Sequence, residues 1–307
     1  MGLLVIRPGL LTTVQDLGRW GHQHRGVPVS GAMDTTSHRL ANRLVGNPES
    51  AATLELTMTG VELVIELPTV FAVAGAEFEL SLDDVPVSMN YPCAAGAKQT
   101  LRFGSRLAGA RAYLAFAGGV DVPEVLGSRS THVASGIGGL AGRALRPGDR
   151  LPVGVSPETQ LQPRRRTEGL TPLPSDGVRV RVLEGPDTDV FGENEMARLC
   201  STRYRVTAES NRMGYRLDGH RLVRSNPDDP LSSGIPNGSV QVPTSGEPIV
   251  LLADRQTVGG YPRIATVISA DLPVVGQLKV SQWIEFETCS YETARRALAA
   301  LEQSLIA

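Results

Sequence analysis

Short runs of alternating apolar and polar residues, separated by glycine and proline, cover most of the chain. Such alternation places successive side chains on opposite faces of a strand, and few stretches show the longer period of a helix. The pattern therefore predicts a mainly β protein with a few short helices. The runs that we expect to form strands are 61–67, 71–82, 99–104, 111–119, 178–185, 204–208, 248–254, 265–270 and 282–289.

Three segments have the apolar spacing of a helix. Residues 33–47 carry leucines on one side, and Asp34 stands where an N-cap is needed. Residues 192–201 form a second candidate. Residues 290–307 are the clearest, because Ser290 can cap a segment whose apolar side chains form one stripe.

A proline-rich stretch over 156–177 separates two strand-rich halves, and linkers of this composition commonly mark domain boundaries. We therefore expect a β-barrel domain over 1–155, a linker over 156–177, and a second β-barrel domain with a C-terminal helix over 178–307. In both halves an alternating strand is followed by a Val-Pro turn and then by an apolar strand that ends in paired glycine. This common order suggests an internal duplication.

Charge and composition exclude several classes of protein. With 30 basic and 32 acidic residues interspersed, the chain lacks the basic face that nucleic acid binding requires, and the one basic run, 164–166, lies in the predicted linker. No apolar run approaches the length of a membrane span or a signal sequence, so we expect a cytoplasmic protein without a membrane partner. Cys93, Cys200 and Cys289 lack the spacing of a metal site and are expected to be reduced, mostly buried thiols.

The stretch LLADRQTVGGYPRI (251–264) changes from a buried strand to dense polar chemistry without a break. Functional side chains on β scaffolds usually lie at such strand exits, where paired glycines allow a tight turn. The alternative is an Asp–Arg pair that only satisfies a turn. The candidates in this stretch are Asp254, Arg255, Gln256, Thr257, Gly259, Gly260 and Tyr261.

Residues 12–34 are equally dense in polar side chains, and we expect them to be too polar for a core element. The candidates there are Gln15, Asp16, Arg19, His22, His24, Arg25, Ser30 and Asp34. Two histidines at i and i+2 without a third ligand favour a loop over a metal site. A third stretch, 209–219, offers Asn211, Arg212 and Tyr215, which suit a carboxylate, an amide or a phosphate, or else an ordinary turn.

Several motifs of self-contained enzymes are missing from the sequence. It has no Walker-type phosphate loop, no Gly-x-Ser-x-Gly elbow and no His-Glu-x-x-His. The segment GIGGLA (136–141) fits a dinucleotide pattern only loosely and is better interpreted as a glycine-rich turn. The two lysines, Lys98 and Lys279, lack the Met-Lys-Met setting of a biotin carrier, so no biotin is expected on this chain.

Five segments together resemble a family whose members are variously called the C subunit of 5-oxoprolinase, allophanate hydrolase subunit 2, KipI antagonist and biotin-dependent carboxyltransferase family protein. They are VIRPGLLTTVQDLGRWGHQHRGVPVSGAMD, NRLVGNPESAATLELTMTG, YLAFAGGVDVPEVLGSRST, SNRMGYRL and VLLADRQTVGGYP. The resemblance implies two tandem cyclophilin-like β-barrel domains. It also implies that the chain is not catalytic alone. Its implied partners are the B subunit of 5-oxoprolinase, which resembles allophanate hydrolase subunit 1, and the A subunit of 5-oxoprolinase.

The activity implied by this resemblance is the ATP-dependent opening of 5-oxoproline to glutamate, with ATP bound by the complex, between subunits. Opening a lactam requires activation of its carbonyl oxygen and fixed donors for the developing negative charge. On that basis Arg255 and Arg212 are candidates for oxyanion or phosphate stabilisation, and Asp254 or Asp16 would position them or act as base. The predicted substrate-binding set is Gln15, Arg19, Ser30, Asn211, Tyr215, Gln256, Thr257, Gly259, Gly260 and Tyr261.

Two other functions fit the same resemblance. The chain could belong to a carboxyltransferase that moves a carboxyl group from carboxybiotin, carried by another protein, to urea or a related amide. It could instead be a non-enzymatic antagonist of a kinase inhibitor, for which the arginines near residues 212 and 255 would be dispensable.

Overall fold

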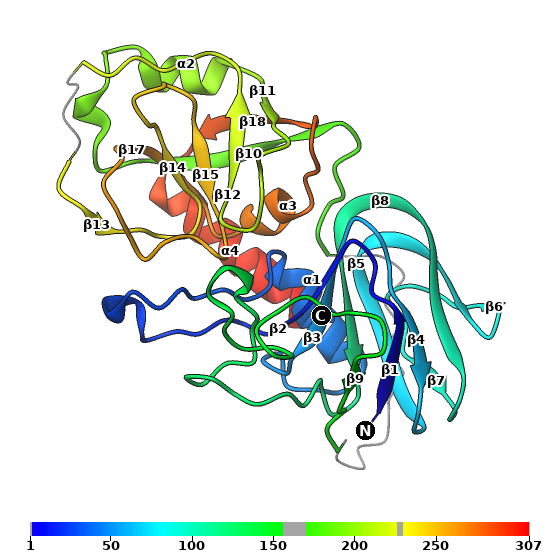
Figure 1. Ribbon diagram of the computed structural model, residues 1–307. Helices are drawn as coiled ribbons and strands as arrows, with labels where there is room; N and C mark the ends of the chain where they lie inside the picture. The colour runs from blue at the N-terminus through cyan, green and yellow to red at the C-terminus, as the bar shows by residue number, and fades with distance from the viewer. Residues whose placement is uncertain (1, 156–169, 226–229, 307) are drawn as a thin grey trace. The chain divides into compact units, whose positions relative to one another are not determined.

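The computed structural model describes residues 2–155, 170–225 and 230–306. The chain divides into two compact units (Figure 1): unit 1 comprises Met1–Trp20 and Ser30–Leu173, and unit 2 comprises Gly21–Val29 and Pro174–Ala307. The grouping of Gly21–Val29 with unit 2 was not foreseen from the sequence. Most of the predicted linker, 156–169, and the basic run 164–166 lie outside the described residues.

Unit 1 is built on a nine-stranded sheet in the order β2-β3-β8-β4-β1-β9, and β5 pairs with β6, β7 and β8. The mainly β class is confirmed, and this sheet curls into a half-barrel. Its strands are β1 (Leu3–Arg7), β2 (Leu11–Gln15), β3 (Thr53–Thr57), β4 (Glu62–Ile65), β5 (Thr69–Leu82), β6 (Val85–Pro86), β7 (Cys93–Ala95), β8 (Thr100–Phe116) and β9 (Arg150–Leu151).

Strand β8 is one continuous strand where the sequence predicts two, at 99–104 and 111–119. The glycine-containing residues between them suggest a turn, but they continue the pairing with β5. The register between β5 and β8 shifts at three places between Gly75 and Leu80. Such bulges let a long strand bend without ending, which explains why the glycines do not interrupt it.

The two faces of the sheet differ in chemistry. Val14, Leu54 and Leu114 point into the main apolar core, whereas the alternate positions Thr13, Glu55 and Tyr113 are paired across β2, β3 and β8 on the other face. Helix α1 (Thr35–Leu44) contacts β5, β8 and β3. A smaller apolar cluster that includes Leu40 and Tyr113 lies between α1 and the sheet, so polar groups on this face are buried.

Unit 2 contains a closed barrel in the order β10-β17-β14-β15-β12-β11-β18. Strand β10 runs parallel to β18, and the other pairs are antiparallel. The barrel strands are β10 (Gly177–Glu184), β11 (Tyr204–Val206), β12 (Gly214–Asp218), β14 (Ser239–Gln241), β15 (Ile249–Leu251), β17 (Arg263–Val267) and β18 (Trp283–Thr288). A separate ribbon pairs β13 (Ser233–Gly234) with β16 (Val258–Gly259).

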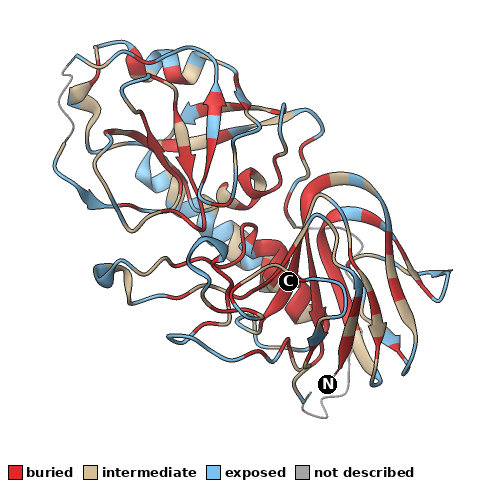
Figure 2. Ribbon diagram, in the orientation of Figure 1, coloured by how far each residue is buried: buried red, intermediate tan, exposed pale blue. Residues whose placement is uncertain are grey.

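The predicted helices are confirmed. Asp34 caps α1 by accepting a hydrogen bond from the Ser37 amide. Helix α2 (Glu195–Ser201) and α4 (Tyr291–Ile306) lie in the other two predicted segments, and Ser290 accepts from the Thr293 amide at the start of α4. The short helix α3 (Leu272–Gly276) was not predicted. Figure 2 shows α4 as mostly exposed.

No helix among the described residues is long and apolar enough to cross a membrane. The three cysteines are free, but they are partly exposed, whereas we expected them to be mostly buried. Each lies at or near the end of a strand or helix. Partial burial raises the pKa of all three thiols.

Candidate functional site

The predicted site residues fall into two clusters, one in each unit. In unit 2, Arg212 and Asp254 form a buried bidentate ion pair, with Nε to Oδ2 at 2.9 Å and Nη2 to Oδ1 at 3.0 Å. The Asp254 amide also donates to the Arg212 carbonyl at 2.9 Å. Both side chains are under one tenth exposed. A pair that satisfies itself in this way holds two loops together, and its charges largely cancel.

Arg255, the next residue, is buried in a different environment. Its Nε donates to the Ile235 carbonyl at 2.9 Å and its Nη1 to the Leu252 carbonyl at 3.2 Å. Among the described residues no carboxylate lies within ion-pair distance of its guanidinium. Burial alone lowers the pKa of Arg255 to about 10. Buried charges are normally paired, so Arg255, 7% exposed and held by backbone carbonyls in the described part of the chain, is unusual.

Two glutamine amides extend this cluster beyond Arg255. Gln256 Nε2 donates to Gln241 Oε1 at 3.3 Å, and Gln241 Nε2 donates to the Tyr261 carbonyl at 3.1 Å. A Cβ at Gly259 would lie 3.1 Å from Gln256 Nε2 and 3.2 Å from Gln241 Nε2. The glycine therefore lets β16 approach the amide pair closely. Sequence reasoning missed Gln241, which lies on β14 and is 1% exposed.

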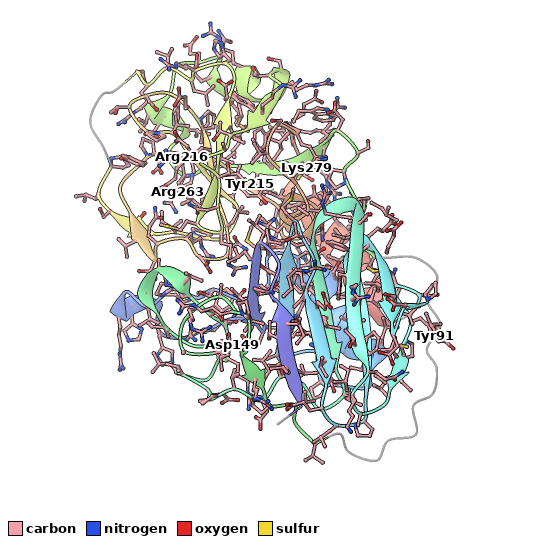
Figure 3. The ribbon with its side chains drawn as sticks, turned by 45° about the vertical axis from the view of Figure 1, so that its right-hand side comes forward. Tyr91, Asp149, Tyr215, Arg216, Arg263 and Lys279 are labelled. Carbon is pink, nitrogen blue, oxygen red and sulfur yellow. The ribbon has the colours of Figure 1, made fainter. Side chains whose placement is uncertain are left out.

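The remaining predicted residues of unit 2 have visible structural roles or are open to solvent. Asn211 Oδ1 accepts from the Met213 amide at 2.8 Å, as in an Asx turn. Tyr215, labelled in Figure 3, is buried on β12 and donates to the Leu278 carbonyl at 3.1 Å. Thr257 and Gly260 are half-buried and the Tyr261 side chain is exposed.

In unit 1, Asp16 joins two loops that lie far apart in the sequence. Its Oδ1 accepts from the Gly18 amide, Ser128 Oγ and Ser130 Oγ at 2.8, 2.7 and 2.5 Å. Its Oδ2 accepts from the Arg129 amide at 2.6 Å. With the carboxylate so fully bonded, the geometry supports a positioning role for Asp16 rather than that of a base.

Arg19 is 1% exposed and lies against the same loop. Its Nε donates to the Val125 carbonyl at 2.7 Å and its Nη2 to the Ser130 carbonyl at 2.8 Å. The GIGGLA segment covers this side chain: a Cβ at Gly138 would lie 2.1 Å from the Ser130 carbonyl oxygen and 2.7 Å from Arg19 Nη2. The interpretation of this segment as a glycine-rich turn fits that close approach.

Gln15 and Ser30 are also buried, with exposures of 0% and 6%. The expectation that residues 12–34 are too polar for a core element is therefore wrong. Strand β2 occupies the start of this stretch, and its polar side chains are buried because backbone carbonyls and hydroxyls accept their hydrogen bonds. Among the described residues, Gln15 Oε1 and Ser30 Oγ are buried without a hydrogen-bond partner.

A buried network under α1 was not predicted. Tyr113 donates to Glu55 Oε2 at 2.8 Å and accepts from the Asp34 amide at 2.7 Å. Burial raises the pKa of Tyr113 well above its usual value and lowers that of His38 to about 4. His38 Nδ1 lies 2.9 Å from Thr53 Oγ1. The one sequence feature that pointed to this network was Glu55, which stands between two leucines on β3. An alternating pattern predicts that such a residue faces solvent.

Over the described residues, no group of three or more His, Cys, Asp or Glu side chains is arranged to hold a metal ion. His22 and His24 flank the start of a short 3-10 turn at Gln23–Arg25, and His24 Nε2 lies 3.2 Å from Arg25 Nε. This matches the loop that the sequence favoured for these histidines.

Comparison with known proteins places this geometry in a family. Residues 25–288 match the family model described as carboxyltransferase domain, subdomain A and B. The chain is 43% identical to the C subunit of 5-oxoprolinase from Escherichia coli, over 96% of this chain and 94% of that protein. It is 38% identical to the corresponding C subunit from Haemophilus influenzae, over 92% of this chain and 90% of that protein.

Among solved structures, the urea amidolyase of Kluyveromyces lactis superposes with a TM-score of 0.89 at 34% identity. The match covers 99% of this chain and 20% of that one, so this chain spans about a fifth of the urea amidolyase. These matches confirm the resemblance found in the sequence. The chain belongs to the family of the carboxyltransferase domain, subdomain A and B, together with the C subunits of 5-oxoprolinase.

Proposed function

We propose that this chain is the C subunit of an ATP-dependent 5-oxoprolinase, which opens 5-oxoproline to glutamate. Two relatives named as the C subunit of 5-oxoprolinase, aligned along nearly their whole lengths, support the proposal. Because both names describe one part of a larger enzyme, they support the expectation of partners, which we propose to be the A and B subunits. The reaction takes place in the assembled complex.

The observation that carries the proposal is the environment of Arg255. 5-Oxoproline has a carboxylate, and its lactam oxygen gains negative charge as the ring opens. A guanidinium already stripped of water, with no carboxylate of the described residues to neutralise it, interacts strongly with such a charge. Arg255 therefore binds an anionic oxygen of the substrate or of the transition state.

The neighbouring residues would position Arg255 and the substrate. The Arg212–Asp254 pair fixes the backbone directly before Arg255, and each of these residues can do so without taking part in the chemistry. The Gln256 and Gln241 amides offer donors and acceptors to the neutral part of a lactam. The rest of this substrate-binding edge consists of Thr257, Gly259, Gly260 and Tyr261. Asn211 and Tyr215 have a structural role beside it.

ATP would supply the phosphoryl group that activates the lactam oxygen. The described residues fit an anionic group of this kind at one place, the Arg255 guanidinium, because it is a planar donor that stays charged at neutral pH. We propose that the rest of the nucleotide is held by the other polypeptides of the complex. We propose that this chain carries no biotin, because neither of its two lysines has a Met-Lys-Met setting.

Carboxyl transfer is the second candidate, favoured by the likeness to a urea amidolyase. In that reaction the Arg255 guanidinium would bind the carboxyl group while it is transferred. The two functions predict different products from one preparation. In the complex reconstituted with the A and B subunits, 5-oxoprolinase activity would release glutamate, ADP and phosphate from 5-oxoproline, ATP and water. Carboxyl transfer would need a carboxybiotin carrier and would move labelled carboxylate to urea.

Glutamate release that requires all three polypeptides and ATP would support the first function. Its absence, together with labelled transfer from a carboxybiotin carrier to urea, would establish the second. We propose a cytoplasmic location, where either reaction would have access to ATP.

A further inference from the structure

A backbone carbonyl fixes the orientation of the Gln241 side chain. Gln241 lies on β14 and is 1% exposed, and its Nε2 donates to the Tyr261 carbonyl at 3.1 Å. Turning the amide over would bring Gln241 Oε1 against that carbonyl, and two oxygens that can only accept repel each other. The pairing of β14 with β17 also shifts register between Val240 and Gln241, and such bulges re-aim side chains. Gln241 is therefore held with its Nε2 toward Tyr261.

Gln241 in turn determines how the Gln256 amide is oriented. Gln241 Oε1 can only accept, and Gln256 Nε2 donates to it at 3.3 Å. A Cβ at Gly259 would lie 3.1 Å from Gln256 Nε2 and 3.2 Å from Gln241 Nε2, so the backbone of β16 lies close to the nitrogens of both amides. The oxygen of Gln256, Oε1, is therefore the end of its amide that faces away from Gln241.

Gln256 Oε1 makes no hydrogen bond to the part of the chain that the structure describes, and the side chain is half-buried. The backbone that carries it is fixed on both sides by Ile235. The Arg255 guanidinium donates through Nε to the Ile235 carbonyl at 2.9 Å, and the Ile235 amide donates to the Thr257 carbonyl at 3.0 Å. Gln256 thus presents an acceptor whose position and orientation are both set before any ligand arrives.

We propose that Gln256 is a specificity-determining residue that selects a ligand with an N–H group, and that Gln241 is the positioning residue that keeps Gln256 Oε1 toward this ligand. The hydrogen bonds run in one direction, from the ligand N–H to Gln256, from Gln256 to Gln241, and from Gln241 to the Tyr261 carbonyl. An amide turned the other way would present an NH2 group and select an acceptor instead. That the N–H is the lactam N–H of 5-oxoproline rests on the proposed function, whereas the orientation of the two amides does not.

The test compares 5-oxoproline with its lactone counterpart, 5-oxotetrahydrofuran-2-carboxylate. The lactone keeps the carboxylate and the ring carbonyl but has a ring oxygen in place of the N–H. That oxygen would meet Gln256 Oε1, another acceptor. Isothermal titration calorimetry of the full chain, alone and in the reconstituted complex without ATP, measures both dissociation constants. The wild type should bind 5-oxoproline about ten- to a hundredfold more tightly than the lactone.

The ratio of these two dissociation constants reports on orientation rather than on stability. Gln241→Met removes both contacts of Gln241 and lets the Gln256 amide turn over, so the ratio should fall about three- to tenfold. Gln241→Glu keeps an oxygen that accepts from Gln256 Nε2 and should retain most of the ratio, even where it lowers the melting temperature. Gln256→Met, at a half-buried position, removes the acceptor and should bring the ratio close to one.

Gln282 offers a matched control in the same unit. It is 4% exposed, and its Nε2 donates to the Pro174 and Ser175 carbonyls, both at 3.0 Å. Gln282→Met therefore removes a buried glutamine amide of similar bonding and should leave the ratio unchanged. The inference is wrong if the wild type binds both compounds equally, if neither preparation binds 5-oxoproline, or if Gln241→Met and Gln256→Met keep the wild-type ratio.

Failure of this inference and failure of the proposed function give different results. A complex that releases glutamate from 5-oxoproline, with a ratio that neither Gln241→Met nor Gln256→Met changes, would keep the 5-oxoprolinase assignment and refute the roles of the two glutamines. A complex that selects 5-oxoproline over the lactone through Gln256 but releases no glutamate when ATP is added would refute the assignment and keep those roles.

Discussion

Arg212 and Asp254 lie in a two-point ion pair inside unit 2, with both oxygens of the carboxylate bonded to the guanidinium. The adjacent Arg255 shares their burial, and its partners among residues 2–155, 170–225 and 230–306 are backbone carbonyls. Two arginines from neighbouring loops thus have different environments: Arg212 is paired with a carboxylate of its own chain, and Arg255 is held by backbone carbonyls. Sequence reasoning treated them as equivalent.

The first prediction concerns the stability of unit 2. Asp254→Ala leaves the Arg212 charge buried without its carboxylate and should lower the free energy of unfolding by about 3–5 kcal/mol. The double variant Arg212→Met, Asp254→Leu removes both charges and should be less destabilised than Asp254→Ala. Urea unfolding followed by far-UV circular dichroism measures both. A loss below about 1 kcal/mol in the single variant would mean that the pair does not hold the loops.

The second prediction concerns activity. In the reconstituted complex, Arg255→Ala should lower kcat/KM for 5-oxoproline by about 100- to 1000-fold, the usual loss when one fixed donor to a developing charge is removed. Arg255→Lys keeps a charge but loses the planar fork, so it should fall in between. Arg216→Ala, an exposed arginine of the same unit labelled in Figure 3, is the matched control and should be unaffected. Activity within about twofold of wild type in Arg255→Ala would rule out the proposed role.

The third prediction uses two glycines of the GIGGLA segment. Gly136 and Gly138 both have left-handed backbones, with φ at +63° and +69°. A Cβ at Gly136 meets nothing within 4 Å, whereas at Gly138 it would overlap the Ser130 carbonyl and Arg19 Nη2. Gly136→Ala should therefore show only the backbone cost of about 1 kcal/mol, and Gly138→Ala a markedly larger one. Equal melting temperatures for the two variants would show that the turn does not press on Arg19.

The fourth prediction is a pH dependence from His38. Burial lowers the pKa of His38 to about 4 in the folded chain, whereas an unfolded histidine has a pKa near 6.5. The unfolded state therefore binds the proton more tightly. The contribution of neutral His38 to the free energy of unfolding is complete above pH 6.5. It is lost as the pH falls toward 4, by about 3 kcal/mol in total.

Urea unfolding between pH 7 and pH 4 measures this loss. The midpoint should fall more steeply in the wild type than in His38→Gln, which has no proton to gain. His24→Gln is the matched control, because His24 is exposed and should leave the wild-type slope unchanged. Parallel pH profiles for the wild type and His38→Gln would contradict the prediction.

Local signals made much of the fold predictable. Alternation located most strands of unit 2, and Asp34 and Ser290 marked the helix starts, because caps depend on residues only three positions apart. The continuous β8 was missed because the bulges that let it bend depend on its partner β5. The repeated order of segments in the two halves also suggested two similar barrels, although whether a sheet closes is decided by pairing between distant strands.

The site was predictable as a set of segments but not as a set of roles. The density of polar residues located Arg255 and Asp16. Nothing local could show that Asp254 is taken by Arg212, 42 residues away, or that Asp16 is bonded by serines more than 110 residues away. The Glu55–Tyr113 contact was invisible for the same reason, since it joins positions 58 residues apart.

Strand β1 pairs with β4 on one side, where Leu3 faces Ile65, and with β9 on the other, where Leu3 faces Leu151. During synthesis, β4 is made soon after β1, whereas β9 is made much later. A ribosome adds about 5–20 residues per second, so the β9 side of β1 stays open for on the order of ten seconds after β4 has emerged. An unpaired strand edge is a template for joining other chains. Nascent copies of this protein are therefore most exposed to aggregation, and most dependent on chaperones, during that interval.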